Sequence, residues 1–307
     1  MSGSDPLVWL PFDPAELGEL PEGLRYERVD PVRDELPASK DEVRFLVPNY
    51  QLGGRIGPFL AQLPALEVVQ TQTAGVDDVR PHVPEGVTLC NGRGIHDAST
   101  AELAVTLTLS VLRGIPGFTR DQDRAEWNHG WRRSLADRRV MILGYGSIGA
   151  AVEARLTPFE CEVVRVARSA REGVHAFTEL PDLLSDVDVV VVIVPLTDET
   201  RGLVDADFLG RLPDDALVVN VARGPVIDTD ALLAELHAER LHAALDVFDT
   251  EPLPSDHPLW TAPNVLMTPH VGGTSSAMQP RAYALIRAQL ARFAAGEPLE
   301  NVMTGAY

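Results

Sequence analysis

The feature of this chain that most constrains its fold is a short apolar run that leads directly into a glycine-rich turn. Val140–Leu143 predicts a buried strand, the turn Gly144-Tyr145-Gly146-Ser147-Ile148-Gly149 follows it, and Ala150–Leu156 predicts a helix. In this context the first glycine permits the tight turn, the second lets the backbone approach a pyrophosphate, and the third allows close helix–strand contact. The helix N-terminus also favours negative charge. The pattern therefore predicts a dinucleotide site, with a glycine-rich turn that holds no ligand as the alternative.

The turn lies within a series of valine- and isoleucine-rich runs in the second half of the chain. These runs do not alternate with polar residues, which indicates strands buried on both faces, as in a parallel sheet covered by helices. Six such strands suit a doubly wound nucleotide-binding fold. The predicted strands are Arg139–Leu143, Glu162–Val166, Val187–Val194, Leu217–Val221, Ala243–Val247 and Val265–Thr268.

A first, smaller series precedes this one, and two long helices flank the second. One helix runs from Ser99 or Thr100, as its N-cap, to about Arg113, with Pro116 after its end and a polar stretch from Thr119 to Asp137 beyond. The other, about Ser276 to Ala295, has Ala284, Leu285, Leu290 and Phe293 as its apolar positions, and we expect it to pack on the first domain. The first series has strands at Leu7–Leu10, Leu24–Val29, Val43–Val47, Leu66–Gln70 and Val87–Cys90, and a helix at Gly57–Leu63.

These patterns predict an α/β protein made of two Rossmann-like domains with doubly wound parallel sheets. The substrate domain would be discontinuous and comprise residues 1–98 and 276–307. The dinucleotide-binding domain would comprise residues 99–275.

The composition excludes several classes of function. The chain has 307 residues, of which 45% are hydrophobic and 23% charged, so it is not disordered as a whole. Its net charge of −19 repels nucleic acid and anionic membranes. Cys90 and Cys161 are too few for a disulfide framework, and Met1–Pro6 lacks the character of a signal peptide. We expect a cytoplasmic protein that binds neither nucleic acid nor membrane, and we predict no metal site.

The end of the second strand of the nucleotide domain indicates which cofactor binds. An NAD-type site places an acidic residue there to hold the ribose 2′-hydroxyl, but counting about 18 residues past Gly149 leads to Ala167. Arg168, Ser169 and Arg171 follow, and guanidinium groups bind phosphate well. We expect NADP(H) to be preferred, with NAD(H) possible. The alternative is a solvated basic turn.

Arg223, Glu251 and His270 each come shortly after one of the last three predicted strands. Parallel α/β sheets keep their active sites at these strand ends. Together the residues offer a cation for an anionic substrate, a proton donor, and a carboxylate that orients and charges the donor. Singly, a histidine after a strand is more often structural, and a surface glutamate is usually solvated. The presence of all three on the edge that bears the glycine-rich turn favours a catalytic site.

The chain resembles the D-isomer-specific 2-hydroxyacid dehydrogenases from about residue 73 to 273, whereas residues 1–72 match only in pattern. The matching motifs occur in the family's order. They are Thr73-Ala74-Gly75-Val76-Asp77, Thr100-Ala101-Glu102-Leu103-Ala104-Val105, the glycine-rich turn, Asn220-Val221-Ala222-Arg223-Gly224-Pro225-Val226-Ile227-Asp228, Leu245-Asp246-Val247-Phe248, Glu251-Pro252-Leu253-Pro254, His257-Pro258-Leu259-Trp260, Asn264-Val265 and Thr268-Pro269-His270-Val271-Gly272-Gly273.

The resemblance implies reversible reduction of a 2-keto acid to the D-2-hydroxy acid. Arg223 would hold the substrate carboxylate and polarise the keto oxygen, His270 would donate the proton, and Glu251 would hold the imidazole and favour its charged form. Asp246 would line the nicotinamide side, or serve only as a strand-end carboxylate. The resemblance also implies a second carboxylate contact at Ala74, Gly75 and Val76, a pyrophosphate contact at Ser147 and Ile148, and a nicotinamide side formed by Val194, Pro195, Val221 and Ala222, with Gly272 and Gly273 beside His270.

The missing ribose acid makes the chain most similar to the NADPH-preferring glyoxylate/hydroxypyruvate reductases of the family. We therefore expect a small substrate such as glyoxylate, hydroxypyruvate or pyruvate. Tyr50 either faces the substrate or packs on its own loop, and Arg55 either meets a second anionic group or is solvated. Trp127 and Trp131 lie in a region that helps form the dimer in related reductases, so we expect a homodimer; the alternative is a local hydrophobic anchor.

The motifs also bear on three other functions. Formate dehydrogenase-like relatives have glutamine at the position of Glu251, so a Glu–His pair argues against that chemistry. A short form of D-3-phosphoglycerate dehydrogenase fits the motifs. A non-catalytic, corepressor-like protein that only senses the dinucleotide also fits, because such proteins can retain the three catalytic residues.

Overall fold

The structure is a computed structural model that describes residues 5–30, 35–50 and 52–304. The chain divides into two compact units. One comprises Met1–His96 together with Ser276–Tyr307, and the other comprises Asp97–Ser275. Each unit is built on its own parallel sheet, and the predicted fold class is therefore confirmed.

The Asp97–Ser275 unit contains a seven-stranded parallel sheet in the order β12-β11-β10-β9-β6-β7-β8. Chain order reverses between β6 and β9, and in open α/β sheets ligands bind outside the carboxyl ends of the strands at such a point. The strands are β6 Arg139–Leu143, β7 Glu162–Ala167, β8 His175–Ala176, β9 Val189–Val192, β10 Leu217–Asn220, β11 His242–Leu245 and β12 Val265–Met267.

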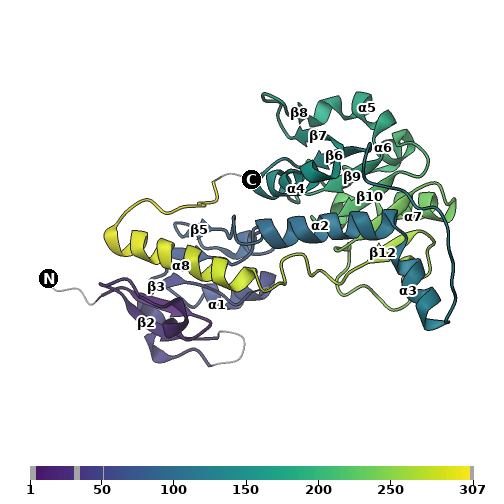
Figure 1. The fold of residues 1–307 in the computed structure, drawn as a ribbon. Coiled ribbons are helices and arrows are strands. Elements are labelled where there is room, and N and C mark those ends of the chain that lie inside the picture. The colour runs from purple at the N-terminus through teal and green to yellow at the C-terminus, as the bar shows by residue number, and fades with distance from the viewer. Residues whose placement is uncertain (1–4, 31–34, 51, 305–307) are drawn as a thin grey trace. The chain divides into compact units, whose positions relative to one another are not determined.

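Helices cover both faces of this sheet (Figure 1). Along β6 the side chains alternate between two cores, with Met141 and Leu143 in one and Val140 and Ile142 in the other. The first core includes residues of α6 and α7, and the second includes residues of α2 and α4, which pack against each other. Burial on both faces explains why these strands lack polar alternation. The helices are α2 Asp97–Leu112, α3 Ile115–Asp123, α4 Ser147–Leu156, α5 Leu180–Leu183, α6 Ala206–Arg211 and α7 Thr229–His237.

The other unit has a five-stranded parallel sheet in the order β2-β1-β3-β4-β5. Its C-terminal helix α8 (Met278–Ala295) lies against the sheet (Figure 1) and buries Ile286 and Leu290 beside Val8 and Phe45. The remaining elements are β1 Leu7–Leu10, β2 Arg25–Arg28, β3 Val43–Leu46, β4 Val68–Gln70, β5 Thr88–Cys90 and α1 Gly57–Leu60.

Some local predictions are wrong. Helix α2 begins at Asp97, so Ser99 and Thr100 lie in its first turn and are not its N-cap. Pro116 lies after the end of α2, as predicted, but it stands in the first turn of another helix, α3, where the missing N–H has no helical partner to lose. That helix was not predicted, and it occupies the start of the polar stretch from Thr119 to Asp137. Ala284 of α8 is exposed, whereas the polar Gln289 is buried.

Within the described residues, no single helix is long and apolar enough to cross a membrane. Only α2 and α3 taken together, with a bend of 66° between them, meet the criteria of length and composition.

Candidate active site

The glycine-rich turn joins β6 to α4 at the point where the sheet order reverses. Gly144 has a φ of +114°, and a Cβ placed there would lie 2.6 Å from the carbonyl carbon of Ile193. A Cβ on Gly149 would lie 2.4 Å from the carbonyl oxygen of Gly144. Both positions therefore require glycine.

Gly146 differs from its two neighbours in the motif. Among the described residues, no atom lies within 4 Å of the Cβ that a side chain at Gly146 would add. Gly146 is also the N-cap of α4, and it makes no side-chain capping bond. The first amides of α4 therefore need an external acceptor, as a pyrophosphate would provide. The turn fits a dinucleotide.

Ser147 and Ile148, for which a pyrophosphate contact is predicted, are the first two residues of α4. The Ser147 hydroxyl donates to the Asp97 carboxylate at 3.2 Å. The group that Ser147 offers to an anion is therefore its backbone N–H.

The end of β7 carries the residues predicted to choose the cofactor. Ala167 is the last residue of the strand, and Arg168, Ser169 and Arg171 are exposed just beyond it. Arg171 is held in a tight turn by two backbone hydrogen bonds with Val174, of 3.0 and 2.8 Å. Its guanidinium donates to the carbonyl oxygen of Tyr145, within the glycine-rich turn. This turn thus lies next to the phosphate loop.

The structure brings Glu251 and His270 into direct contact. Glu251 Oε2 lies 2.6 Å from His270 Nδ1, and Glu251 Oε1 accepts the N–H of Phe248 at 2.9 Å. Because an ionised carboxylate only accepts hydrogen bonds, Nδ1 carries the proton of this bond. Nε2 is then the ring nitrogen that can exchange a proton with another molecule.

The pKa of Glu251 is lowered by a balance of opposing effects. Partial burial alone would raise this pKa, but the hydrogen bonds from His270 and Phe248 outweigh it. The positive charges of His270 and Arg223 act in the same direction as these bonds. The carboxylate is therefore ionised at neutral pH, and Arg223 lies near enough to contribute to that result.

His270 has a left-handed backbone, with a φ of +51°. Its N–H donates to the carbonyl oxygens of Asp246 at 2.8 Å and Thr268 at 3.1 Å. A left-handed non-glycine residue carries a cost of roughly 1–3 kcal/mol, and such residues cluster at functional sites. Surrounding hydrogen bonds therefore hold this backbone in place.

Asp246 supplies most of those bonds. It is 1% exposed, and its carboxylate accepts from the Thr268 hydroxyl at 2.6 Å and from the N–H groups of Val271 at 2.9 Å and Gly272 at 2.8 Å. The Thr100 hydroxyl of α2 donates to the carbonyl oxygen of Gly272 at 3.3 Å. Asp246 thus organises the loop on both sides of His270, and its role on the nicotinamide side stays a prediction.

Asn220 is a site residue to which sequence reasoning gave no role. Its amide donates to the carbonyl oxygen of Arg223 at 3.0 Å and accepts from the N–H of Ala222 at 3.0 Å. Arg223 Nη1 in turn donates to the Ala222 carbonyl oxygen at 2.8 Å. Asn220 therefore shapes the loop that carries the arginine. Asn220 is the first residue of a motif that carries the family resemblance. Its position at the end of a predicted strand was the sequence signal that could have identified it as a site residue.

Gly224 permits the close approach of two loops. A Cβ on Gly224 would lie 1.8 Å from the carbonyl carbon of Phe248. The backbone after β10, which carries Arg223, therefore rests directly on the backbone after β11, which leads to Glu251. Any side chain at Gly224 would separate them.

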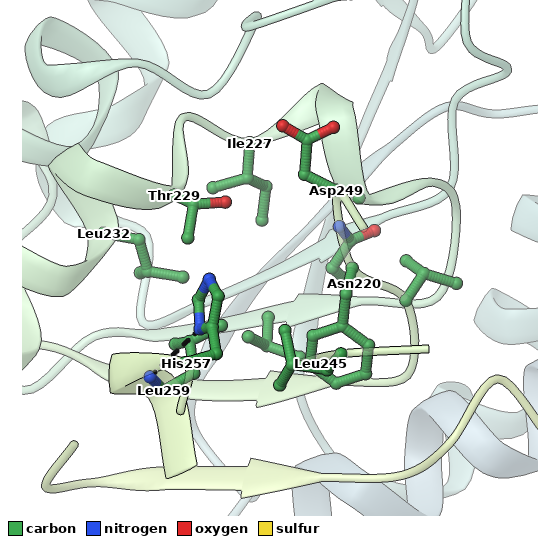
Figure 2. A pocket seen from close by; sticks show the side chains of 12 residues that line it. Asn220, Ile227, Thr229, Leu232, Leu245, Asp249, His257 and Leu259 are labelled. Carbon is green, nitrogen blue, oxygen red and sulfur yellow. Dashed lines mark hydrogen bonds between the residues drawn. The ribbon is translucent and has the colours of Figure 1, made fainter. Parts of the chain in front are cut away.

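A small cavity lies behind these two loops (Figure 2). Its volume of about 20 Å³ suits a single water molecule, far below the roughly 300–1,000 Å³ of ligand pockets. Figure 2 shows Leu232, Leu245 and His257 around it and the carboxylate of Asp249 pointing away. His257 Nδ1 accepts the N–H of Leu259 at 3.2 Å. The cavity is a packing feature that supports the loops and is too small to hold substrate.

The residues predicted to line the nicotinamide side follow neighbouring strands. Val194 follows β9, and Val221 and Ala222 follow β10; all three are buried, whereas Pro195 is exposed. A Cβ on Gly144 would also lie 2.7 Å from the Val194 nitrogen, so Val194 adjoins the phosphate loop. Gly272 is buried and Gly273 is partly exposed.

The predicted substrate residues Tyr50 and Ala74–Val76 belong to the other compact unit. The Tyr50 ring centroid lies 5.5 Å from that of His96. The Ala74 carbonyl oxygen accepts from the Asn91 amide at 2.8 Å, and Val76 is fully buried. Their roles toward a substrate stay predictions.

Comparison with known proteins agrees with this geometry. A family model described as D-isomer specific 2-hydroxyacid dehydrogenase, NAD binding domain, matches residues 105–272. A crystal structure of a D-isomer specific 2-hydroxyacid dehydrogenase from Xanthobacter autotrophicus Py2, in complex with NADPH and MES, is 33% identical, covers 98% of both chains and has a TM-score of 0.83.

Several curated relatives carry named activities, among them a reductase and a dehydrogenase. A glyoxylate reductase from Thermofilum pendens is 32% identical over 249 residues, which are 76% of this chain and 74% of that protein. A D-3-phosphoglycerate dehydrogenase from Methanocaldococcus jannaschii is 32% identical over 251 residues, 78% of this chain but 47% of that longer protein. The chain belongs to the D-isomer-specific 2-hydroxyacid dehydrogenase family. It is an NAD(P)-dependent 2-hydroxyacid dehydrogenase.

Proposed function

We propose that this protein reduces a small 2-keto acid, such as glyoxylate, hydroxypyruvate or pyruvate, to the D-2-hydroxy acid and prefers NADPH to NADH. The observation that carries the proposal is the 2.6 Å contact between Glu251 and His270, with the charge of Arg223 acting on the same carboxylate. This arrangement combines a proton donor, a group that keeps it charged, and a cation for an anionic substrate.

His270 is the proton donor in this proposal. A nicotinamide cofactor held at the glycine-rich turn would supply the hydride for the keto carbon. His270 releases the proton on Nε2 to the keto oxygen as that oxygen gains negative charge. The neutral ring keeps its proton on Nδ1, which stays hydrogen-bonded to Glu251. Glu251 stabilises the imidazolium before the transfer, because an adjacent anion favours the charged form of histidine.

Arg223 binds the substrate carboxylate and polarises the keto oxygen. A guanidinium suits this task because its N–H groups form a planar fork that matches a carboxylate. Asn220 and Gly224 fix the loop on which the arginine stands. The proposed contributions of Tyr50 and of the backbone at Ala74–Val76 rest on the family resemblance alone.

The NADPH preference rests on the end of β7. Ala167 provides no carboxylate to hold the ribose 2′-hydroxyl or to repel a 2′-phosphate, and Arg168, Ser169 and Arg171 offer donors. The structural relative bound to NADPH supports this choice. D-3-phosphoglycerate oxidation is the second candidate, because a dehydrogenase of that substrate is among the relatives.

A substrate panel tests the proposal. Purified protein is assayed with glyoxylate, hydroxypyruvate, pyruvate and 3-phosphohydroxypyruvate, each with NADPH and with NADH. We expect the highest kcat/KM for an unphosphorylated keto acid with NADPH. A highest value for 3-phosphohydroxypyruvate would favour the second candidate, and no turnover of any substrate would contradict both.

We further propose that residues 1–98 and 276–307 form the substrate domain, residues 99–275 form the dinucleotide-binding domain, and the protein is a cytoplasmic homodimer. Trp127 and Trp131 support dimerisation, because they are 96% and 98% exposed in the single chain. Light scattering on the intact protein should give the mass of a dimer. The double variant Trp127→Ser/Trp131→Ser should shift the measured mass toward that of a monomer. A monomeric wild type would contradict the proposed homodimer.

A further inference from the structure

Tyr145, inside the glycine-rich turn, lies close to two guanidinium groups. The Cζ atom of Arg165 is 5.6 Å from the centroid of the Tyr145 ring, and the Cζ atom of Arg171 is 5.7 Å from it. Both distances are within the range of cation–π attraction. The glycine-rich motif specifies no side chain at position 145 and does not include Arg165, so it assigns neither residue a role.

The ring of Tyr145 is anchored through Glu153 of α4. The phenol hydroxyl donates to Glu153 Oε2, and Arg165 of β7 binds both oxygens of the same carboxylate. The Glu153 side chain is 15% exposed. The hydrogen bonds from Arg165 lower the pKa of Glu153, and the bond to Glu153 raises the pKa of Tyr145. At neutral pH the anchor is therefore a carboxylate–guanidinium pair with a neutral phenol bound to it.

Of the two guanidinium groups beside the Tyr145 ring, the anchor neutralises Arg165, whereas Arg171 has no acidic partner among the described residues. Arg165 is paired with Glu153, whereas Arg171 contacts the carbonyl oxygen and the ring of Tyr145, both uncharged. Within the described part of the chain, the hydrogen bonds of the Arg171 side chain use Nη2, so Nε and Nη1 remain available to an anion. The backbone of Arg171 is fixed by its two bonds to Val174. The guanidinium is thus held beside the phosphate loop at the end of β7.

We infer that Tyr145 is a positioning residue for cofactor selectivity, which holds Arg171 ready for the 2′-phosphate of NADP(H), with Glu153 and Arg165 fixing the Tyr145 ring. This inference rests on the proposed use of NADPH. It also gives a cause for that preference. Arg171 is ordered before the cofactor binds, so less conformational entropy is lost on binding.

The inference is tested by calorimetric binding of NADPH and NADH to the intact protein and to Tyr145→Leu, Tyr145→Phe, Arg171→Ala and the double variant Tyr145→Leu/Arg171→Ala. The readout is the ratio of the two Kd values, which cancels effects on the shared part of the site. Tyr145→Leu should reduce the NADPH selectivity roughly two- to fivefold, as expected for an exposed cation–π contact. Tyr145→Phe keeps the ring but removes the hydroxyl that is bonded to Glu153, so it should lose selectivity to a smaller extent than Tyr145→Leu.

The double variant separates positioning from general damage to the turn. If Tyr145 acts through Arg171, Tyr145→Leu should not change the selectivity any further once Arg171 is alanine. An additive loss in the double variant, or an unchanged ratio in Tyr145→Leu, would overturn the inference while leaving the proposed NADPH preference intact. A wild type that binds NADH as tightly as NADPH would overturn both.

Discussion

At the residue scale, the site depends on a few buried polar side chains that hold exposed ones in place. The Asp246 carboxylate accepts three hydrogen bonds around the left-handed His270, and the Asn220 amide bridges the loop of Arg223. Burying such groups is costly unless they are paired, so the bonds are strongly favoured. His270, the proposed proton donor, and Arg223 are therefore oriented before a substrate binds, which lowers the cost of reaching the reactive geometry.

The pairing of Glu251 with His270 gives a pH prediction. Keto-acid reduction consumes a proton, so kcat/KM for reduction should fall as pH rises. Glu251→Gln removes the carboxylate that is hydrogen-bonded to the proposed proton donor, so the fall should move to lower pH. Steady-state kinetics across pH measure this shift. Superimposable profiles would mean that the two residues are not coupled.

The same pair affects stability at acid pH with a definite sign. The pKa of Glu251 is lowered in the folded protein, so its contribution to stability is present above the ordinary carboxyl value of 4.5 and is lost as pH falls through the folded pKa. Denaturant unfolding of wild type and Glu251→Gln should therefore show a difference in stability that is constant above about pH 5 and shrinks as pH falls below that value.

At the element scale, the loops after β10 and β11 function as a pair because Gly224 lets their backbones touch. Gly224→Ala would place a Cβ 1.8 Å from the Phe248 carbonyl carbon. A backbone atom cannot move aside as easily as the end of a flexible side chain. We expect a loss of roughly 1–3 kcal/mol in the free energy of unfolding, as for other overpacked sites, and a fall in kcat/KM as Arg223 and Glu251 separate.

Gly210→Ala is the matched control for this experiment. Gly210 lies in α6, and within the described residues nothing comes within 4 Å of the added Cβ. Alanine in a helix is favoured over glycine by roughly 0.5–1 kcal/mol, so this variant should be as stable as wild type or more so. Denaturant unfolding of the two variants measures the difference. Equal effects would contradict the close-contact explanation.

Elements could be predicted from the sequence where the signal is local. Strands β6, β9 and β10 are buried on both faces, and their valine-rich runs indicate this burial in the sequence. Strand β8 has only two residues, too few for a periodicity, and it was not predicted. In α8, Gln289 is buried because it bonds to Gln70 of β4 at 2.7 Å, a partner 219 positions away that no helical pattern reveals.

The candidate site shows the same limit. Arg223, Glu251 and His270 were predicted because each follows a strand of one parallel sheet, whose carboxyl ends share an edge. The need for glycine at position 224 and the anchoring of Tyr145 by Glu153 and Arg165 depend on loops and side chains that meet only in three dimensions. Such contacts have no signature in spacing or composition.

At the scale of the whole molecule, one sheet unites the two halves of the chemistry. The glycine-rich loop follows β6, the turn proposed to select the cofactor follows β7, and the proposed catalytic residues follow β10, β11 and β12. All these strands are parallel, so one edge of the Asp97–Ser275 unit carries both functions. Selectivity for the cofactor can therefore be changed at β7 without altering the residues that handle the proton.

A change of cofactor tests that separation. Ala167→Asp combined with Arg168→Ala adds a ribose acceptor and removes a phosphate partner, so the preference should reverse to NADH. The wild-type preference should be about ten- to a hundredfold and appear mainly in KM, because the adenosine end does not take part in hydride transfer. Added salt should reduce the preference for NADPH over NADH. A wild type that prefers NADH would show that these arginines form only a solvated turn.

The central claim, that the strand-end residues of this sheet carry out keto-acid reduction, is tested most directly by kcat/KM of Arg223→Ala for glyoxylate with NADPH, compared with Arg168→Ala. Removing a charge-assisted contact to a substrate that gains negative charge should cost a few kcal/mol, so Arg223→Ala should lose roughly a hundred- to a thousandfold. Arg168→Ala should lose much less. A loss of less than tenfold in Arg223→Ala would place the chemistry elsewhere.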